Sequence, residues 1–332
     1  MSAAALLLVE LLREPERAPT LASERWQDVI GVARAEQLIA ALAHRVDGLA
    51  VPVTARAILA DATATAEQGR VAALWESEMV RRALAPIGCP TVLLKGTAFV
   101  AAGLLAGRGR FVGDTDIVVP RAALPDAERA LLAAGWEWVK PDPYDDSYYR
   151  RWMHELPPLI HRERDRMVDV HHTILPLTAR LRPDADALVE AAVPLGNGLH
   201  VLAPPDMICH AAAHLFADGD LSGGLRNLWD IHCLVAEFGT DGLEDRAARH
   251  GLGTAVHRAA RQANELFGTA IPESWRIRDS ADPLFRRRLL ARDGWGRGTR
   301  PLTRLGFYAR GHWMRMPPAM LARHLWTKWR RG

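Results

Sequence analysis

The sequence predicts an α/β (α+β) fold in which a small mixed β-sheet lies between two helical regions. Helical periodicity extends to about residue 88, short apolar β-type runs occur between residues 89 and 200, and helical periodicity returns at Pro204. We therefore expect three units: an N-terminal helical region at 1–88, a sheet-bearing core at 89–200, and a C-terminal helical region with a basic tail at 201–332.

Apolar residues recur every three or four positions between Trp26 and Leu42, and the run 53–84 is rich in alanine with one glycine and no proline, so both segments predict helices. Pro204 and Pro205 can open a further helix. In the core, the expected elements are strands at 91–94, 115–119 and 136–140, a helix at 124–134, a loop at 141–158, and a hairpin formed by 159–163 and 167–173.

Composition excludes several classes of protein. The chain has 332 residues, of which 49% are hydrophobic and 24% charged, as in ordinary globular proteins. No apolar run approaches the ~18 residues that a membrane-spanning helix needs. The three cysteines are widely spaced, which argues against a disulfide framework. We expect a cytoplasmic protein without a transmembrane segment.

Charge is unevenly distributed along the chain. Residues 281–332 carry a net charge of +11, whereas residues 1–280 carry −8, so the overall charge of +3 conceals an acidic body. The tail interleaves arginine with aromatic residues, among them Trp295, Trp313, Trp326 and Trp329. Three alternatives remain open for it: nucleic-acid binding, contact with an anionic membrane surface, or packing on the acidic body through ion pairs.

Two aspartates stand at the mouth of an apolar strand. Asp114 and Asp116 are one residue apart, and because strand side chains alternate with a period of two, both point to the same face. They could share a cation, or they could belong to a solvated turn. Asp169 lies inside another apolar strand, where an unpaired charge would be costly. If the two strands are neighbours, the three carboxylates can hold two divalent ions, Mg²⁺ or Mn²⁺.

A strand-to-helix junction at Lys95, Gly96 and Thr97 predicts an anion-binding segment. Free backbone amides at the start of a helix, a hydroxyl and a lysine all suit phosphate. The chain has only three lysines, which makes Lys95 conspicuous. The run lacks the glycine spacing of a P-loop or a dinucleotide-binding fold, so an ordinary turn remains the alternative.

Taken together, these motifs resemble the uncharacterised bacterial nucleotidyltransferases of the DNA polymerase beta-like superfamily. The resemblance rests on Leu94-Lys95-Gly96, on Arg110 shortly before Asp114-Thr115-Asp116, on Asp169-Val170-His171, and on the run 225–231. It covers most of the chain and makes 89–200 the nucleotidyltransferase core. The chain departs from the superfamily in having Gly96-Thr97 instead of glycine-serine and a longer step to the aspartates.

The resemblance implies transfer of a nucleoside monophosphate from a nucleoside triphosphate, such as ATP, to an acceptor hydroxyl with release of pyrophosphate. Asp114, Asp116 and Asp169 would be the catalytic metal ligands, and Asp169 could also take the acceptor's proton. The nucleotide-binding residues would be Lys95, Gly96, Thr97, Arg110 and His171.

Several functional alternatives remain open. The acceptor could be a small molecule or peptide; a toxin-like enzyme would instead modify RNA or protein, and a non-catalytic relative would only bind nucleic acid through residues 281–332. Asp206, His210 and His214 share a helix face at a spacing that can bind zinc, although structural histidines are the commoner case. The aromatic loop 141–158 could be a lid or a hydrophobic plug.

Overall fold

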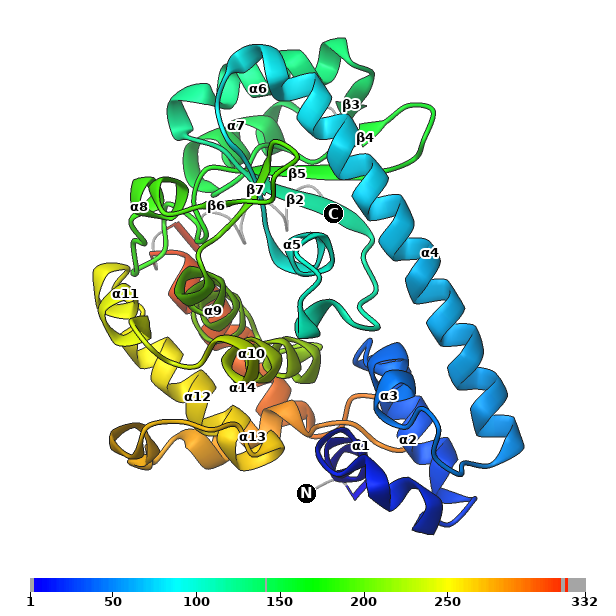
Figure 1. The fold of residues 1–332 in the computed structure, drawn as a ribbon. Coiled ribbons are helices and arrows are strands. Elements are labelled where there is room, and N and C mark those ends of the chain that lie inside the picture. Colours follow the sequence, from blue (N-terminus) through cyan, green and yellow to red (C-terminus); the bar gives the residue numbers. More distant parts are fainter. Residues whose placement is uncertain (1–2, 141, 318–319, 322–332) are drawn as a thin grey trace.

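The computed structural model describes residues 3–140, 142–317 and 320–321 of the chain. Its centre is a seven-stranded mixed sheet with strand order β3-β4-β5-β2-β1-β7-β6. The strands are β1 (Thr91–Leu93), β2 (Asp114–Val118), β3 (Trp136–Trp138), β4 (Leu159–His161), β5 (Met167–His171), β6 (Val193–Pro194) and β7 (Leu199–Val201). Helices flank this sheet, so the predicted α/β architecture is confirmed (Figure 1).

The α-helices fall into the regions that hydrophobic periodicity predicts. Before the sheet they are α1 (Ala3–Arg13), α2 (Arg25–Ala35), α3 (Ile39–Arg45) and α4 (Val53–Leu84). Within the sheet region they are α5 (Lys95–Ala101), α6 (Leu124–Ala133), α7 (Pro143–Trp152) and α8 (Ala185–Glu190). After it they are α9 (Pro204–Ala213), α10 (Gly224–Phe238), α11 (Leu243–Arg249), α12 (Gly253–Phe267), α13 (Asp282–Leu289) and α14 (Pro301–Arg315).

Short 3₁₀ turns and one π-helical turn join these elements. The 3₁₀ turns are η1 (Pro15–Thr20), η2 (Ala85–Ile87), η3 (Leu105–Gly107), η4 (Arg121–Ala123) and η6 (Glu273–Arg276). The π-helical turn η5 (His214–Asp218) continues directly from α9. Within the described residues, no helix combines the length and the apolar character that crossing a membrane requires.

Parallel pairing of β2 with β5 organises the centre of the sheet. Asp116 is the register partner of Asp169, and Asp114 is the partner of Met167. On its other edge β2 pairs with β1 in antiparallel orientation, and β1 continues the sheet by pairing with β7 in parallel. The strands predicted at 91–94 and 115–119 and the hairpin between β4 and β5 are thereby confirmed.

The segment 141–158 is largely helical, so the prediction of a loop there was wrong. Its proline and aspartate content, which indicated a loop, begins a helix instead. The Asp142 carboxylate accepts a hydrogen bond from the Tyr144 amide at 2.9 Å, and Pro143 occupies a first-turn position where no backbone N–H is needed.

The sheet extends further along the chain than the sequence indicates. The sequence predicts no strand between residue 173 and Pro204, yet this stretch contains α8 and the strands β6 and β7. These strands are only two and three residues long. Their pairing with β1 and with each other, and not local periodicity, makes them strands.

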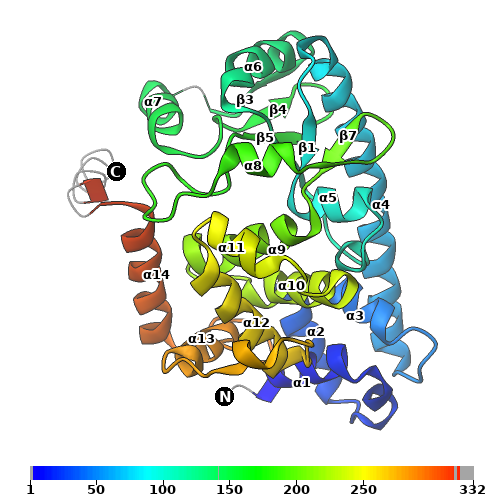
Figure 2. The same ribbon diagram turned by 60° about the vertical axis from the view of Figure 1, so that its left-hand side comes forward.

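Helix α4 runs along one side of the molecule, from the N-terminal helices to the sheet (Figures 1 and 2). It packs against α3 at one end and against α5 and α6 further along. The C-terminal helices α9, α10 and α12 pack on one another, and α1 contacts α12. The two helical regions therefore touch each other at the end of the molecule away from the sheet (Figures 1 and 2). The boundaries expected at residues 88 and 200 stay a prediction.

The basic tail is bound to the rest of the chain by ion pairs over its described part. Arg292 contacts Glu36 at 2.7 Å, Arg315 contacts Asp218 at 2.7 Å, and Arg286 pairs with Glu265. These contacts fit the alternative in which the tail packs on the acidic body. Residues 318–319 and 322–332, which include Trp326 and Trp329, lie outside the described residues.

Gly109 sets how closely the N-terminal helices approach the core. It has a φ of +64°, and a Cβ at this position would lie 2.4 Å from the carbonyl carbon of Ala40. We predict that Gly109→Ala lowers the free energy of unfolding by about 2–4 kcal/mol, through left-handed strain and the backbone clash. Gly113→Ala is the control, because its Cβ would meet nothing within 4 Å. Denaturant unfolding measures both; equal stability of the two variants would contradict the prediction.

Candidate active site

The sheet brings the three predicted carboxylates together. Asp114 and Asp116 lie on β2 and Asp169 lies on β5, and one carboxylate oxygen from each falls within 4.8 Å of the others. The alternation of side chains along β2 places Thr115 on the opposite face. Asp114 is exposed, Asp169 is half-buried and Asp116 is 2% exposed, so the cluster extends from the surface into the interior.

Asp116 is the most strongly stabilised member of this cluster. Its Oδ1 accepts a hydrogen bond from Lys95 Nζ at 2.7 Å and lies 3.0 Å from Nε2 of His171. Burial alone would raise the pKa of Asp116, but Lys95 and His171 together hold that pKa below its usual range. Asp116 is therefore ionised, and its contacts with Lys95 and His171 fix these two side chains in the site.

Asp169 has the opposite environment. Burial, followed by the negative charges of Asp116 and Glu155, raises the pKa of Asp169 to about 7. Its Oδ1 is buried and has no hydrogen-bond partner among the residues described. Burial and Asp116 likewise raise the pKa of Asp114. Three clustered carboxylates with an unpartnered buried oxygen fit a hard divalent cation such as Mg²⁺ or Mn²⁺.

The junction between β1 and α5 positions Lys95 and Thr97 against β2. Lys95 adopts a left-handed φ of +50°, and its side chain reaches Asp116. The Thr97 hydroxyl donates to the carbonyl of Asp114 at 3.0 Å, so it holds the start of β2. Gly96 leaves room for Arg110, since a Cβ there would lie 2.9 Å from Arg110 Nε. The contacts of Lys95, Gly96 and Thr97 with phosphate stay predictions.

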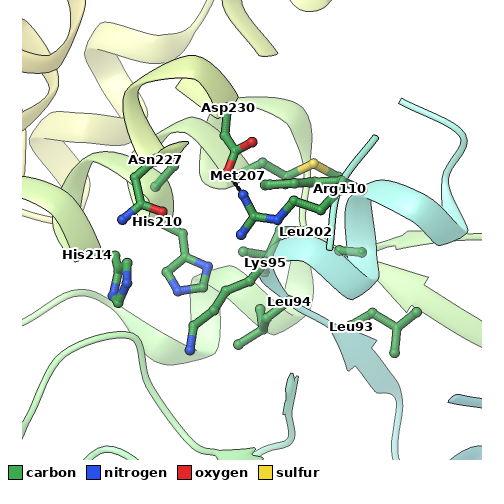
Figure 3. Close-up of a pocket in the computed structure, with 13 residues that line it drawn as sticks. Leu93, Leu94, Lys95, Arg110, Leu202, Met207, His210, His214, Asn227 and Asp230 are labelled. Atoms are coloured by element: carbon green, nitrogen blue, oxygen red, sulfur yellow. Dashed lines mark hydrogen bonds and ion pairs between the residues drawn. The ribbon is translucent and has the colours of Figure 1, made fainter. Parts of the chain in front are cut away.

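Arg110 is an interior residue of the site, not a surface charge. Its guanidinium pairs with the Asp230 carboxylate, which also pairs with Arg226 of the same helix, α10 (Figure 3 shows the Arg110–Asp230 contact). The side chains of Arg110, Arg226 and Asp230 are 15%, 4% and 4% exposed. One buried carboxylate thus holds two arginines, which leaves a net positive charge at this wall.

A cavity of about 420 Å³ opens beside the carboxylates. All three predicted regions contribute to its wall, because it takes residues from the end of α2, from the sheet and from the C-terminal helices. Its polar lining residues are Glu36, Gln37, Lys95, Thr97, Arg110, Asp114, Asp116, His214, Ser222, Arg226, Asn227 and Arg292.

His210 and His214 line a smaller inner pocket that Lys95 also lines. In Figure 3, His210 and His214 lie near the Lys95 side chain, with Asn227 above them. Burial, followed by the positive charge of Lys95, lowers the pKa of both imidazoles, to about 4 for His214. Both rings are therefore neutral near pH 7.

The zinc alternative for these two histidines finds no support in their surroundings. Asp206, which shares their helix face, is turned to Arg246 and to His250, whose Nε2 lies 3.0 Å from Asp206 Oδ1. In the part of the chain that the structure describes, His210 and His214 belong to no group of three potential ligands.

Sequence reasoning missed several residues that shape the site. Glu155 lies 3.4 Å from Nδ1 of His171, and Arg292 joins Glu36, which lies 256 positions earlier in the chain. Long-range contacts of this kind leave no local signal. Arg226 and Asp230 could have been found, because both belong to the run 225–231 that carries part of the family resemblance.

Comparison with known protein families gives a match that covers the site. Residues 22–268 match the family described as uncharacterised nucleotidyltransferase, which is more than half of the chain. The chain belongs to this nucleotidyltransferase family. The expected resemblance is thereby confirmed, and the match includes every predicted site residue. No curated protein matches the sequence.

The raised pKa of Asp169 predicts that the ionised form of this carboxylate destabilises the folded nucleotidyltransferase. The pKa is higher in the folded chain, at about 7, than the ordinary 3.8, so ionisation of Asp169 costs stability as pH rises from about 4 through 7. We predict that Asp169→Asn raises Tm by about 1–3 °C near pH 8 in a chelating buffer. Near pH 5 the difference is smaller, because only the first part of the loss of stability between pH 4 and 7 has then occurred.

Thermal melts at the two pH values, with and without Mg²⁺, provide the measurement. Mg²⁺ should stabilise the wild type more than Asp169→Asn, since it binds the native carboxylates. Asp126→Asn, at an exposed carboxylate of α6, is the matched control and should follow the wild type. A lower Tm for Asp169→Asn near pH 8 would contradict the account.

Proposed function

We propose that this protein transfers a nucleoside monophosphate from a nucleoside triphosphate to a hydroxyl group of a small molecule or peptide, releasing pyrophosphate. The convergence of Asp114, Asp116 and Asp169 on adjacent strands is the observation that carries the proposal. Family membership supports the reaction class. A bond forms between the acceptor oxygen and the α-phosphorus, and the bond from the α-phosphorus to the bridging oxygen of pyrophosphate breaks.

The charges of the cavity support a triphosphate as one substrate. Lys95, Arg110, Arg226 and Arg292 all line it, which offers four cationic side chains to a polyanion. Each of these cations has a carboxylate partner: Asp116 for Lys95, Asp230 for Arg110 and Arg226, and Glu36 for Arg292. These pairs keep the cations ordered, so that a phosphate meets donors already in place.

The carboxylate cluster would hold two divalent ions, Mg²⁺ or Mn²⁺. When bound there, such ions supply positive charge to the phosphoryl oxygens of the transition state. Lys95 and His171 orient Asp116 through its Oδ1, and this leaves its second oxygen for the cluster. Asp169, with a pKa of about 7, is the group suited to accept the proton of the acceptor hydroxyl.

A second cavity adjoins the first and provides space for another reactant. It measures about 400 Å³ and shares His214, Ser222 and Asn227 with the cavity beside the carboxylates. Its far wall is α14, through residues 308–315. Both volumes lie within the ~300–1,000 Å³ of small-molecule pockets, which favours a nucleotide and a small acceptor or the end of a peptide.

Asp116→Ala is predicted to abolish turnover of Mg²⁺–NTP. The variant removes the most buried carboxylate and leaves Lys95 and His171 without their partner, so the rate should fall by at least about 10²–10³-fold. Pyrophosphate release with each of the four NTPs and candidate acceptors measures it. Asp126→Asn serves again as the exposed control and should keep the wild-type rate. Wild-type turnover by Asp116→Ala would rule the proposed site out.

The class of acceptor can be tested by labelling. With α-³²P-labelled NTPs and a cell extract, we predict that label enters a product smaller than the proteins and RNAs of the extract. The described tail arginines Arg286, Arg292 and Arg315 are already paired with carboxylates, which disfavours the tail as an RNA-binding surface. Label that resists removal of small molecules and is released by nuclease or protease would instead establish RNA or protein as the acceptor.

A further inference from the structure

A cluster of two histidines and a glutamate lies directly behind the carboxylates. One ligand atom each of His154, Glu155 and His171 falls within 4.8 Å of the others. Glu155 Oε2 lies 3.4 Å from Nδ1 of His171 and 3.7 Å from Nε2 of His154. The two imidazole rings face each other with centroids 5.1 Å apart. The function proposed above uses neither His154 nor Glu155.

Backbone pairing holds this cluster in place. The segment after α7 forms a β-bridge to β5 between Glu155 and His171. The amide of Leu156 donates to the carbonyl of Val170 at 2.9 Å, and the amide of His172 donates to the carbonyl of His154 at 2.9 Å. The side chains therefore project from β5 and from a short segment bridged to it, which makes their spacing a property of the fold.

One imidazole nitrogen of the cluster is buried and makes no hydrogen bond among the described residues. His171 is 1% exposed, and its Nδ1, which lies 3.4 Å from Glu155 Oε2, makes no hydrogen bond to any described residue. In His154 the nitrogen nearest Glu155 is Nε2, at 3.7 Å, so a metal on Nε2 would leave the ring proton on Nδ1. A buried polar atom ordinarily has a partner, so Nδ1 of His171 indicates a ligand that completes the site.

We propose that His154, Glu155 and His171 bind one transition-metal ion, with Zn²⁺ as the preferred ion. Two imidazoles and one carboxylate are a known donor set for zinc, with a fourth position left open. Ligand atoms around tetrahedral zinc are separated by about 3.4 Å, given Zn–ligand lengths of ~2.1 Å. The distances from Glu155 Oε2, 3.4 and 3.7 Å, are close to this value. Nitrogen donors make Mg²⁺ a poor occupant.

His171 would connect this ion to the carboxylate cluster. With the metal on Nδ1, the ring proton must lie on Nε2, which is 3.0 Å from Oδ1 of Asp116. An imidazole that binds a metal and donates its other N–H to a carboxylate is the usual outer arrangement of such sites. The ion would thus fix the tautomer of His171 and the orientation of Asp116. This site stands whether or not the chain transfers nucleotides.

Zinc retention by the full chain tests the proposal. The protein is loaded with Zn²⁺ and then dialysed against zinc-free buffer that contains excess Mg²⁺. The Mg²⁺ is added to occupy the carboxylate cluster. We expect one Zn²⁺ per wild-type chain, and at least about tenfold weaker binding by His154→Gln in a chelator competition. Asp114→Asn, which alters only the carboxylate cluster, and His210→Gln, on α9, should retain zinc as the wild type does. No retained zinc, unchanged retention in His154→Gln, or loss in either control would overturn the proposal.

The wild-type chain also provides a test that needs no variant. X-ray absorption of the zinc-loaded protein should show two imidazole rings and no sulfur among the ligands, which separates this site from Cys89, Cys209 and Cys233. If His154→Gln fails to fold, this spectrum decides. Sulfur ligation, or oxygen ligation alone, would refute the site.

Discussion

The parallel pairing of β2 with β5 is the constraint on which the rest of the site depends. It places Asp116 opposite Asp169 and brings three carboxylates within 4.8 Å of one another at one point of the sheet. Like charges at this separation repel, more so where burial removes water. The two buried carboxylates are stabilised unequally. Asp116 accepts a hydrogen bond from Lys95 and contacts His171, whereas Asp169 has a buried oxygen without a partner among the described residues and a pKa of about 7. That imbalance is what a divalent cation would correct.

The surrounding helices complete the wall of the cavity beside the three carboxylates. Asp230 on α10 holds both Arg110, from the core, and Arg226. Glu36, at the end of α2, accepts from Arg292 and from the Leu225 amide, so it joins the N-terminal helices to the C-terminal ones. Burial, the largest effect, raises the pKa of Glu36, although Arg292 opposes it. The cavity wall is therefore assembled from distant parts of the chain by buried ion pairs, which suits a nucleotidyltransferase that must order a polyanion.

The local features of the fold could be predicted from sequence, whereas the tertiary contacts could not. Period-two alternation places Asp114 and Asp116 on one face of a strand, and the apolar run around Asp169 identifies a second strand. The helix at 143–152 was missed because proline and aspartate serve both loops and helix starts; in the structure the Asp142 carboxylate accepts from the Tyr144 amide, and the Asp146 amide donates to the Asp142 carbonyl. Strand β7 exists through pairing with β1, and β6 through pairing with β7. Glu155 and Arg292 reach the site through long-range contacts that no local sequence pattern indicates.

Anomalous diffraction from crystals grown with Mn²⁺ and a non-hydrolysable nucleoside triphosphate is the most direct measurement of the central claim. The account predicts manganese peaks between Asp114, Asp116 and Asp169, with the triphosphate in the cavity lined by Lys95, Arg110 and Arg226. Manganese bound elsewhere, or a triphosphate bound away from these carboxylates, would contradict it.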